Sequence, residues 1–497
     1  MTTQPHVLLI TLDQFRGDCL SIVDHPLVRT PHLDALARDG ILLRRHYSQA
    51  APCSPGRACL YTGTYQMNNR VVANGTPLDH RFDNVAKMAR RHGYVPALFG
   101  YTDQSVDPRD ASGPDDPRMQ DYTGILPGLD PVVALGDDQL AWRQWLVSLG
   151  HHDPGDGERA LATEPDRPVE HSISTYLTDC AIEWLGRQDG PWFAHLSYMR
   201  PHPPYAAAGE FASKYDPADV PMPIDAANET HPFHRRAARV ARAAAPLDEI
   251  SIRLLRAQYY GMISEVDAQL GRLWSALRAH GMWDDTLIVV TSDHGEQLGD
   301  HGLIQKLGYF EQSYHVLGIV RDPRHPESHG RQLDEFTENI DVFPTICDAV
   351  GAEVPAQCDG MPLTPFLHGG SPPWWRDAAH WEYDWRDVFI RHPPHDWPWD
   401  RRLERMHLAV RRDRSTQYVH FGDGSSLCFD LASDPTARTL VTDPTVVLGN
   451  AQAMLTWRSQ HADRTMTDML VEAGGVGRFP PDAPASFHSS FDTSFRA

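Results

Sequence analysis

The stretch HVLLITLDQ, residues 6–14, is the segment from which the fold can be inferred. It is a short, almost wholly apolar run that stops at the acidic residue Asp13, which is typical of a buried strand. The run TLIVVT, residues 286–291, is followed in the same way by Ser292, Asp293 and His294. Strands that are apolar along their whole length are buried on both faces, as in a parallel sheet covered by helices.

Further helices and strands alternate along the chain on either side of these two runs. The stretch from Thr30 to Ala37 predicts a helix with Thr30 as its N-cap and Pro31 at its first position. A long helix is expected over 250–280, with an interruption at Gly261. Other predicted helices cover 84–93 and 172–185, and other strands cover 95–100 and 191–197. This alternation predicts an α/β fold with a large, mostly parallel sheet flanked by helices.

Three regions depart from that alternation. Residues 104–170 are rich in Asp, Pro and Gly and predict an insertion or an active-site lid, and 206–249 predict a helical excursion on the surface. After about residue 375 short strands are expected at 380–385, 407–411, 417–421 and 427–430, with a helix over 443–463 capped by Asp443. We therefore predict a catalytic α/β domain over 1–375 and a smaller C-terminal α+β subdomain with an antiparallel sheet, plus a tail, over 376–497.

Composition excludes several classes of function. Among 497 residues, 45 Lys and Arg stand against 66 Asp and Glu, so the formal charge is −21 and nonspecific binding to nucleic acid is not expected. The seven cysteines are odd in number and contain no C-x-x-C, which argues against a disulfide framework and a zinc knuckle. The apolar run at 7–12 is too short for a signal sequence or a membrane span. We expect a soluble cytoplasmic protein without a membrane partner.

Polar side chains follow three predicted strands, and Tyr101 and Thr102 are the pair that follows the strand at 95–100. Asp13 and Gln14 follow the first strand, and Asp293 and His294 follow 286–291. Carboxylate, amide and imidazole groups are ligands of divalent cations, and the carboxyl ends of parallel strands meet at one edge of a sheet. A single such pair is explained as well by capping of the next helix. Two pairs at two strand ends favour a metal site.

The segment APCSPGRACLYTG, residues 51–63, raises a separate question about Cys53. A lone thiol is more often a small buried apolar group than a nucleophile. Arg57, four residues later, would lower the pKa of this thiol and favour the thiolate. No neighbouring base resembles the arrangement of a cysteine protease, so the residues alone leave both interpretations open.

The segment from Cys53 to Arg57 matches the C-x-P-x-R signature of type I sulfatases, a branch of the alkaline phosphatase superfamily. The chain is similar to this family from residue 7 to about 365, and most similar to phosphonate monoester hydrolases and related arylsulfatases. The later segment LCFDLASDP resembles the family's C-terminal subdomain. The resembling stretches include HYSQAAPCSPGRACLYTG, MNNRVVANGTP, ALFGYTDQ, SYMRPHPPY, VVTSDHGEQLGDHGLIQKLGYFEQSYHV and DVFPTICDAVG.

The resemblance implies a modified nucleophile and one divalent metal ion. It implies that a formylglycine-generating enzyme converts Cys53 to Cα-formylglycine and that Arg57 orients the hydrated aldehyde. The metal, manganese or calcium by preference with zinc and iron as alternatives, would be held by Asp13, Gln14, Asp293 and His294 together with modified Cys53. The implied contacts to the transferred group or the leaving oxygen are Asn74, Tyr101, Thr102, His202 and Lys306. Related enzymes are homo-dimers or homo-tetramers, so a homo-oligomer is expected.

This residue set suits ester hydrolysis through a covalent intermediate. One hydroxyl of a hydrated aldehyde can attack sulfur or phosphorus, and deprotonation of the second hydroxyl then expels the bound anion and restores the aldehyde. The metal, Arg57, Lys306 and His202 would offset the charge that develops. As the general acid we favour His202 over Lys306, because its imidazole titrates nearer neutral pH. The alternative for His202 is a loop residue that only shapes the backbone.

The expected function is therefore formylglycine-dependent hydrolysis of small anionic esters, namely sulfate or phosphonate monoesters and, by promiscuity, phosphodiesters. Gln14 and His294 stand where typical sulfatases carry Asp and Asn, and Tyr101 stands where they carry Lys, which argues against activity on sulfate alone. The alternatives are a choline-sulfatase-like enzyme and a noncatalytic binding protein with unmodified Cys53. A two-zinc phosphatase or phosphomutase would need further paired Asp and His ligands and a Ser or Thr nucleophile.

Overall fold

The fold is built around one large twisted sheet. The computed structural model describes residues 4–119, 121–227, 229–390, 405–462, 470–471 and 477–478. The strand order is β5-β4-β6-β1-β7-β8-β2-β9, and of these neighbours only the two that pair with β8 are antiparallel. The strands are β1 (His6–Leu12), β2 (Ile41–Tyr47), β4 (Ala97–Gly100), β5 (Asp130–Ala134), β6 (Phe193–Tyr198), β7 (Thr286–Thr291), β8 (Gly318–Arg321) and β9 (Gln332–Glu338). The predicted α/β class and mostly parallel sheet are confirmed.

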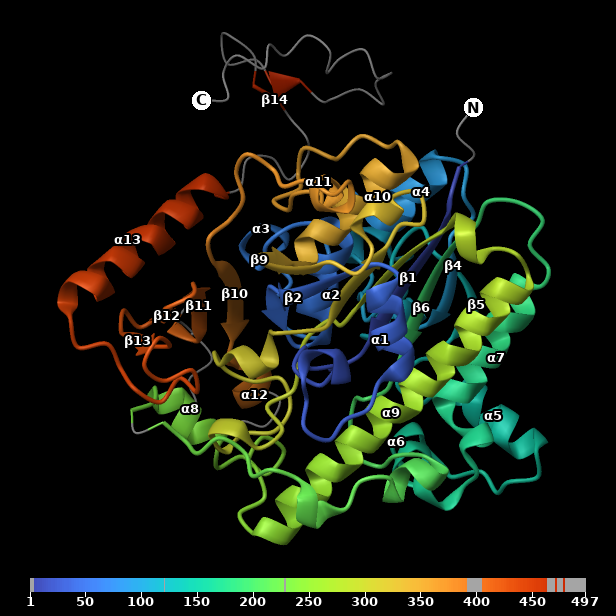
Figure 1. The fold of residues 1–497 in the computed structure, drawn as a ribbon, viewed down its shortest axis with the longest axis horizontal. Helices are drawn as coiled ribbons and strands as arrows, with labels where there is room; N and C mark the ends of the chain where they lie inside the picture. The colour runs from blue at the N-terminus through green and yellow to red at the C-terminus, as the bar shows by residue number, and fades with distance from the viewer. Residues whose placement is uncertain are drawn as a thin grey trace.

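Helices cover both faces of this sheet, as Figure 1 shows. Along β1, Leu8 and Ile10 belong to one core, and Val7 and Leu9 belong to another on the opposite face. The first core includes α1 (Pro31–Arg38), α5 (Leu140–Ser148), α6 (Gly157–Ala162), α7 (Ile173–Leu185) and α9 (Glu249–Ala279). The second includes α2 (Cys53–Thr62), α4 (Val85–Arg91), α10 (Val342–Val350) and α11 (Thr364–Leu367). Because both faces are covered, every residue of β1 after the first is buried.

Two details of the predicted helices are wrong. Helix α1 begins at Pro31 as expected, but the Thr30 side chain does not cap it and instead donates to Asp34 Oδ1 at 3.0 Å. Helix α9 runs through Gly261 without interruption. A Cβ at Gly261 would lie 2.4 Å from the Phe211 carbonyl oxygen, so the glycine permits close packing rather than a break.

Four strands of the large sheet escaped the sequence prediction, namely β2, β5, β8 and β9. Strand β5 lies within 104–170, so this region is more than an insertion or lid. It forms an edge of the sheet and four of its five residues are exposed, which removes the apolar run that would have revealed it. The described residues of 206–249 contain the short helix α8 (Pro232–Ala237) and no strand, in agreement with the predicted helical excursion.

A second sheet, with the order β13-β12-β11-β10-β3, joins the C-terminal region to the segment before Cys53. Its antiparallel part is β10 (Ala379–Asp384), β11 (His407–Arg412), β12 (Thr416–Phe421) and β13 (Ser426–Asp430), which confirms the strands expected there. The short strand β3 (Ala50–Ala51) pairs in parallel with β10, and the Glu382 amide donates to the Gln49 carbonyl at 2.9 Å. The second sheet thus crosses the boundary predicted at residue 375, and the boundary itself stays a prediction.

The remaining elements lie near this second sheet or in short separate segments. Asp443 caps α13 (Pro444–Gln460) as predicted, since its side chain accepts a hydrogen bond from the Thr445 amide. The other elements are α3 (Gln66–Asn69), α12 (Arg386–Ile390), β14 (Leu470–Val471) and β15 (Gly477–Arg478). Asp463, the predicted end of the last helix, and most of the tail lie outside the described residues.

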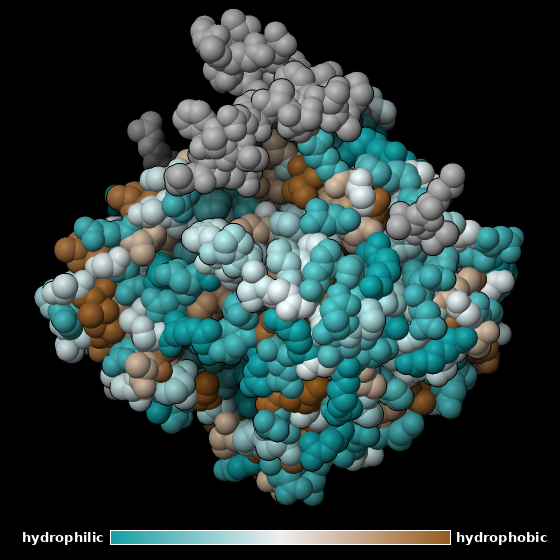
Figure 2. Space-filling view, turned by 45° about the horizontal axis from the view of Figure 1, so that its top comes forward, coloured by the Kyte–Doolittle hydropathy of each residue, from teal (hydrophilic) through white to brown (hydrophobic). Residues whose placement is uncertain are grey.

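The face of the molecule in Figure 2 is mostly hydrophilic. The face in Figure 2 carries hydrophobic residues in small separate patches among hydrophilic ones. Among the described residues, no helix combines the length and the apolar character that crossing a membrane requires.

Candidate active site

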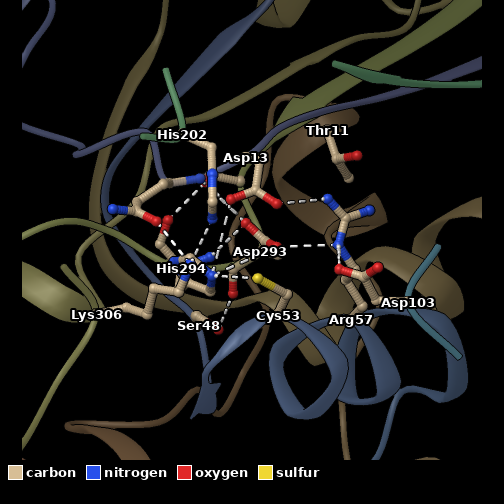
Figure 3. A network of polar contacts seen from close by, with 12 residues as sticks. Thr11, Asp13, Ser48, Cys53, Arg57, Asp103, His202, Asp293, His294 and Lys306 are labelled. Atoms are coloured by element: carbon tan, nitrogen blue, oxygen red, sulfur yellow. Dashed lines mark hydrogen bonds and ion pairs between the residues drawn. The ribbon is translucent and has the colours of Figure 1, made fainter. Parts of the chain in front are cut away.

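The sequence-predicted residues meet at the carboxyl ends of four neighbouring strands. These strands are neighbours in the order β4-β6-β1-β7. Tyr101 follows β4, the loop that carries His202 follows β6, Asp13 follows β1, and Asp293 lies two residues after β7. Figure 3 shows Asp13, His202, Asp293 and His294 around one centre, together with Cys53, which is the first residue of α2. The sheet topology therefore brings together groups that lie up to 280 positions apart (293 − 13) in the chain.

Cys53 is buried in this cluster, with its Sγ atom 3.2 Å from His294 Nε2. Burial, followed by the nearby Asp13 carboxylate, raises the pKa of the Cys53 thiol well above its ordinary value. The predicted lowering of this pKa by Arg57 is therefore wrong. An unmodified Cys53 is a neutral thiol at this position and a poor nucleophile.

Arg57 is completely buried and binds carboxylates rather than Cys53. Its Nε atom donates to Asp293 Oδ2 at 3.0 Å and its Nη2 atom donates to Asp13 Oδ2 at 3.1 Å. The third nitrogen donates to Ser197 Oγ at 2.7 Å, and the guanidinium lies 4.4 Å from the centre of the Tyr101 ring. With these donors Arg57 orients the two carboxylates. The role that the resemblance implies for Arg57, orienting the hydrated aldehyde, stays a prediction.

The carboxylates, the thiol and one imidazole have the arrangement of a metal site. Ligand atoms of Asp13, Cys53, Asp293 and His294 all lie within 4.8 Å of one another. The Asp13 Oδ1 atom is buried without a hydrogen-bond partner, so this oxygen is left as a ligand atom for a metal ion. Burial, and then Asp13, raise the pKa of Asp293, because two buried carboxylates repel one another. A divalent cation would relieve this repulsion, so the residues present fit one.

Gln14 lies beside these ligands, held by three contacts. Its backbone N–H donates to Asp293 Oδ1 at 3.2 Å. In its side chain, Oε1 accepts from Lys306 Nζ at 2.8 Å and Nε2 donates to Glu296. Glu296 is buried and also accepts from the Tyr205 hydroxyl at 2.9 Å. Glu296 is not among the site residues predicted from the sequence, although the motif Ser292-Asp293-His294-Gly295-Glu296 contains it. Its contacts identify it as the residue that orients the Gln14 amide.

Lys306 and His202 form a contacting pair at the edge of the cluster. The Lys306 Nζ atom lies 2.8 Å from His202 Nε2, and His202 Nδ1 lies 2.7 Å from the Pro203 carbonyl oxygen. A carbonyl accepts only, so Nδ1 carries the proton and Nε2 accepts from the ammonium group. Burial, followed by Lys306, lowers the pKa of His202 to about 3. Lys306, rather than the favoured His202, therefore carries the proton in this arrangement.

A pocket of about 90 Å³ opens onto Cys53. Asn74 and Tyr101 line it as expected, Asn74 Oδ1 accepts from the Ser54 amide at 2.9 Å, and the Tyr101 hydroxyl donates to Asp13. Thr102 does not line it, because its hydroxyl donates to the Gly124 carbonyl at 2.9 Å and accepts from the Leu126 amide at 2.8 Å. Its neighbour Asp103 lines the pocket instead. Neighbouring residues of an irregular loop point in unrelated directions, so sequence alone did not distinguish the two.

Gly56 sets the distance between α2 and the metal-site loop. A Cβ at this position would lie 2.4 Å from the Asp293 carbonyl oxygen and 2.9 Å from that of Ala50. We expect Gly56→Ala to lower the free energy of unfolding by about 1–3 kcal/mol, because two backbone segments must move apart. Chemical denaturation measures this change. Gly190→Ala is the control, since nothing lies within 4 Å of its Cβ. An equal effect of both changes would contradict the assigned role of Gly56.

Comparison with known proteins agrees with this geometry. The family model described as Sulfatase matches residues 5–352. The chain belongs to the sulfatase family. A second model, N-sulphoglucosamine sulphohydrolase, C-terminal, matches residues 299–447. The matched Sulfatase segment contains every residue of the cluster described above.

Individual relatives cover almost the whole chain. The chain is 39% identical over 502 aligned residues to the multifunctional alkaline phosphatase superfamily protein PehA of Trinickia caryophylli, an alignment that covers 94% of this chain and 97% of that protein. It is 27% identical over 449 residues to an arylsulfatase of Clostridium perfringens, with 87% and 89% covered. The crystal structure of the phosphonate monoester hydrolase of Agrobacterium radiobacter superposes with a TM-score of 0.86 at 43% identity and covers 96% of this chain and 100% of that one.

The two-zinc alternative does not fit this member of the sulfatase family. In the part of the chain that the structure describes, the other group with metal-ligand spacing is Asp79, His80 and Asp107. Arg109 pairs with Asp79 at 2.8 Å and with Asp107 at 2.5 Å, so these carboxylates already have cationic partners. This group belongs to a different pocket from the one that opens onto Cys53. Among the described residues, no second group of three His, Cys, Asp or Glu ligands therefore lies next to the first.

Proposed function

We propose that this protein is a formylglycine-dependent hydrolase of sulfate monoesters, phosphonate monoesters or both, assisted by one divalent metal ion. The observation that carries the proposal is the convergence of Cys53, two carboxylates and an imidazole within 4.8 Å, next to a pocket that Cys53, Asp13 and Lys306 line. A thiol held neutral by burial at this centre has little use as it stands. Its conversion to an aldehyde gives the position a function.

The bound groups would supply the reactive chemistry. A divalent cation held by the strand-end residues would supply Lewis-acid polarisation of the transferred group. Formylglycine at position 53 would supply one hydroxyl for attack and a second for release of the anion. Manganese or calcium suits an oxygen and nitrogen donor set, with zinc and iron as alternatives.

The remaining residues bind, orient and supply a proton. Arg57 holds the two carboxylates in place through its contacts at 3.0 and 3.1 Å. Lys306 is the cation directed into the pocket, and we propose that it donates the proton to the leaving oxygen. His202 accepts a hydrogen bond from Lys306 and fixes the direction of its ammonium group. Asn74 and Tyr101 line the same pocket and are placed to contact the transferred group.

The proposal extends to maturation, location and assembly. We propose that a formylglycine-generating enzyme modifies Cys53, that the protein is cytoplasmic and that it forms a homo-dimer or homo-tetramer. The resemblance to type I sulfatases supports the modification of Cys53 and the assembly.

Rates on three 4-nitrophenyl esters test the proposed activity: the sulfate, the phenylphosphonate and the ethyl phosphodiester. We expect the sulfate ester, the phosphonate ester or both to be hydrolysed at least about 10³-fold faster than by heat-denatured protein, a small part of what enzymes achieve. Peptide mass spectrometry at Cys53 accompanies the assay. Formylglycine at position 53 without hydrolysis of any ester would contradict the proposal, and a thiol in the mature protein would favour the noncatalytic alternative.

A further inference from the structure

The pocket above Cys53 has two chemically different sides. One side carries Lys306 and His202 and faces the metal-site residues. The residues that line the rest of the pocket include two further acidic residues, Asp103 and Asp137, and Gln139. The proposed chemistry uses the first side and leaves the second without a role. We call Asp103, Asp137 and Gln139 the acceptor side, because each presents carboxylate or amide oxygens.

Asp103 is held rigidly, and its carboxylate has one distant cationic partner. Its backbone has a left-handed φ of 50°, and Gln104 Nε2 donates at 3.2 Å to the carbonyls of both Asp103 and Ser54. These contacts tie Asp103 to the first turn of α2. Its side chain is almost fully buried and accepts no hydrogen bond from any described residue, and its ion pair with Arg57 is long, at 4.0 Å. Figure 3 shows Asp103 beside Arg57, on the side away from His202.

Asp137 and Gln139 complete this side from the turn before α5. Gln139 has a left-handed φ of 52°, and its amide donates to the Gly136 carbonyl at 3.0 Å, which closes a tight turn at the pocket. Its side chain is 2% exposed and its Oε1 is buried without a partner. Asp137 is exposed and accepts a hydrogen bond from the Tyr122 hydroxyl at 3.0 Å. Tyr122 also lines the pocket.

We propose that the acceptor side binds a primary or secondary ammonium group on the organic part of the substrate. The inference rests on the proposed function and names the class of ester that this site prefers. Buried acceptors without donors are costly, and an N–H cation supplies both the charge and the hydrogen bonds that they lack. Two carboxylates beside the transferred group would also repel a substrate whose transferred group carries two negative charges. The substrate class is therefore a monoanionic phosphodiester or phosphonate monoester with a nearby ammonium group.

Quaternary ammonium groups fit this side less well. They carry no N–H donor and are recognised in proteins by aromatic faces. The aromatic residues that line this pocket are Tyr101 and Tyr122, and the Tyr101 ring face is already covered by Arg57 at 4.4 Å. A small N–H cation is thus distinguished from a choline-like group by hydrogen bonding.

Three 4-nitrophenyl phosphodiesters with the same leaving group test the inference: the ethyl, the 2-aminoethyl and the choline esters. We expect kcat/KM for the aminoethyl ester to exceed that for the ethyl ester by about 10-fold or more, as for hydrogen bonds to charged groups. The choline ester should fall well below the aminoethyl ester. Equal values for the aminoethyl and ethyl esters, or for the aminoethyl and choline esters, would overturn the inference.

Two variants and a control locate the effect. Asp103→Asn and Asp137→Asn should each reduce the aminoethyl-to-ethyl ratio of kcat/KM several-fold. Asp138→Asn removes the same charge one residue away, outside the pocket, where Asp138 pairs with Arg143, and should keep the wild-type ratio. A ratio that is unchanged in both acceptor-side variants would overturn the inference.

The outcomes also separate this inference from the function on which it rests. Hydrolysis of 4-nitrophenyl sulfate without hydrolysis of any phosphodiester would overturn the inference and leave the proposed function standing. Failure to hydrolyse the sulfate, the phosphonate and the phosphodiesters would overturn both.

Discussion

Cys53→Ala is expected to lower kcat/KM for aryl ester hydrolysis by about 10⁴-fold or more, a loss typical of removing a nucleophile. The change deletes the sulfur atom, so the β-carbon from which the aldehyde would be made is left as an unreactive methyl group. The side chain is buried at the first position of α2, and alanine fits there without a clash, so the fold should remain. Initial rates on the 4-nitrophenyl sulfate and phenylphosphonate measure the effect.

A matched cysteine on the same helix provides the control. Cys59 is also buried in α2, but its contact is with the Asn69 side chain at 3.4 Å and it lies outside the pocket. Cys59→Ala should keep most of the activity. Parent-like rates in Cys53→Ala, with a normal unfolding transition, would refute the assignment of Cys53.

Removal of the metal is expected to abolish hydrolysis, and added manganese or calcium should restore it. The same ion should raise the melting temperature of stripped protein, because a ligand that binds only the folded state stabilises it. Asp293→Asn should lose both responses, since it removes a ligand and a partner of Arg57. Metal content, activity and thermal unfolding are measured on the same preparations.

Asp79→Asn is the control for this experiment. Asp79 belongs to the other group with metal-ligand spacing, but its carboxylate already pairs with Arg81 and Arg109, each at 2.8 Å. The variant should bind metal and respond to it as the parent does. Unchanged rates in thoroughly stripped parent protein, or equal metal content in Asp293→Asn, would count against the metal site.

Several features of the site were predictable because they are local in sequence. An apolar run predicts strand β1, and the end of that run identifies Asp13 as the residue at the carboxyl end of the strand. The same holds for β7 and Asp293. Because parallel strands place their carboxyl ends at one edge, the meeting of these two residues could be predicted without coordinates.

Other features depended on contacts that no local pattern contains. The direction of the Arg57 guanidinium is set by two carboxylates from distant strand ends, at 3.0 and 3.1 Å. Thr102 is kept out of the pocket by its hydrogen bonds with the loop at 124–126, where it donates to the Gly124 carbonyl and accepts from the Leu126 amide. Which ring nitrogen of His202 carries the proton is decided by its two neighbours, the Pro203 carbonyl and Lys306.

The sequence by itself determined the α/β class, the family resemblance and the residues that we propose to carry the chemistry, because hydrophobic periodicity and short motifs are encoded over a few neighbouring positions. The tertiary structure alone decided what each of those residues faces. It paired β3 with β10, so that the C-terminal sheet supports the segment leading to Cys53. It also raised the pKa of the Cys53 thiol, although the cation of Arg57 lies four positions away in the chain. Burial and charge depend on everything packed around a group, and those neighbours come from every part of the chain.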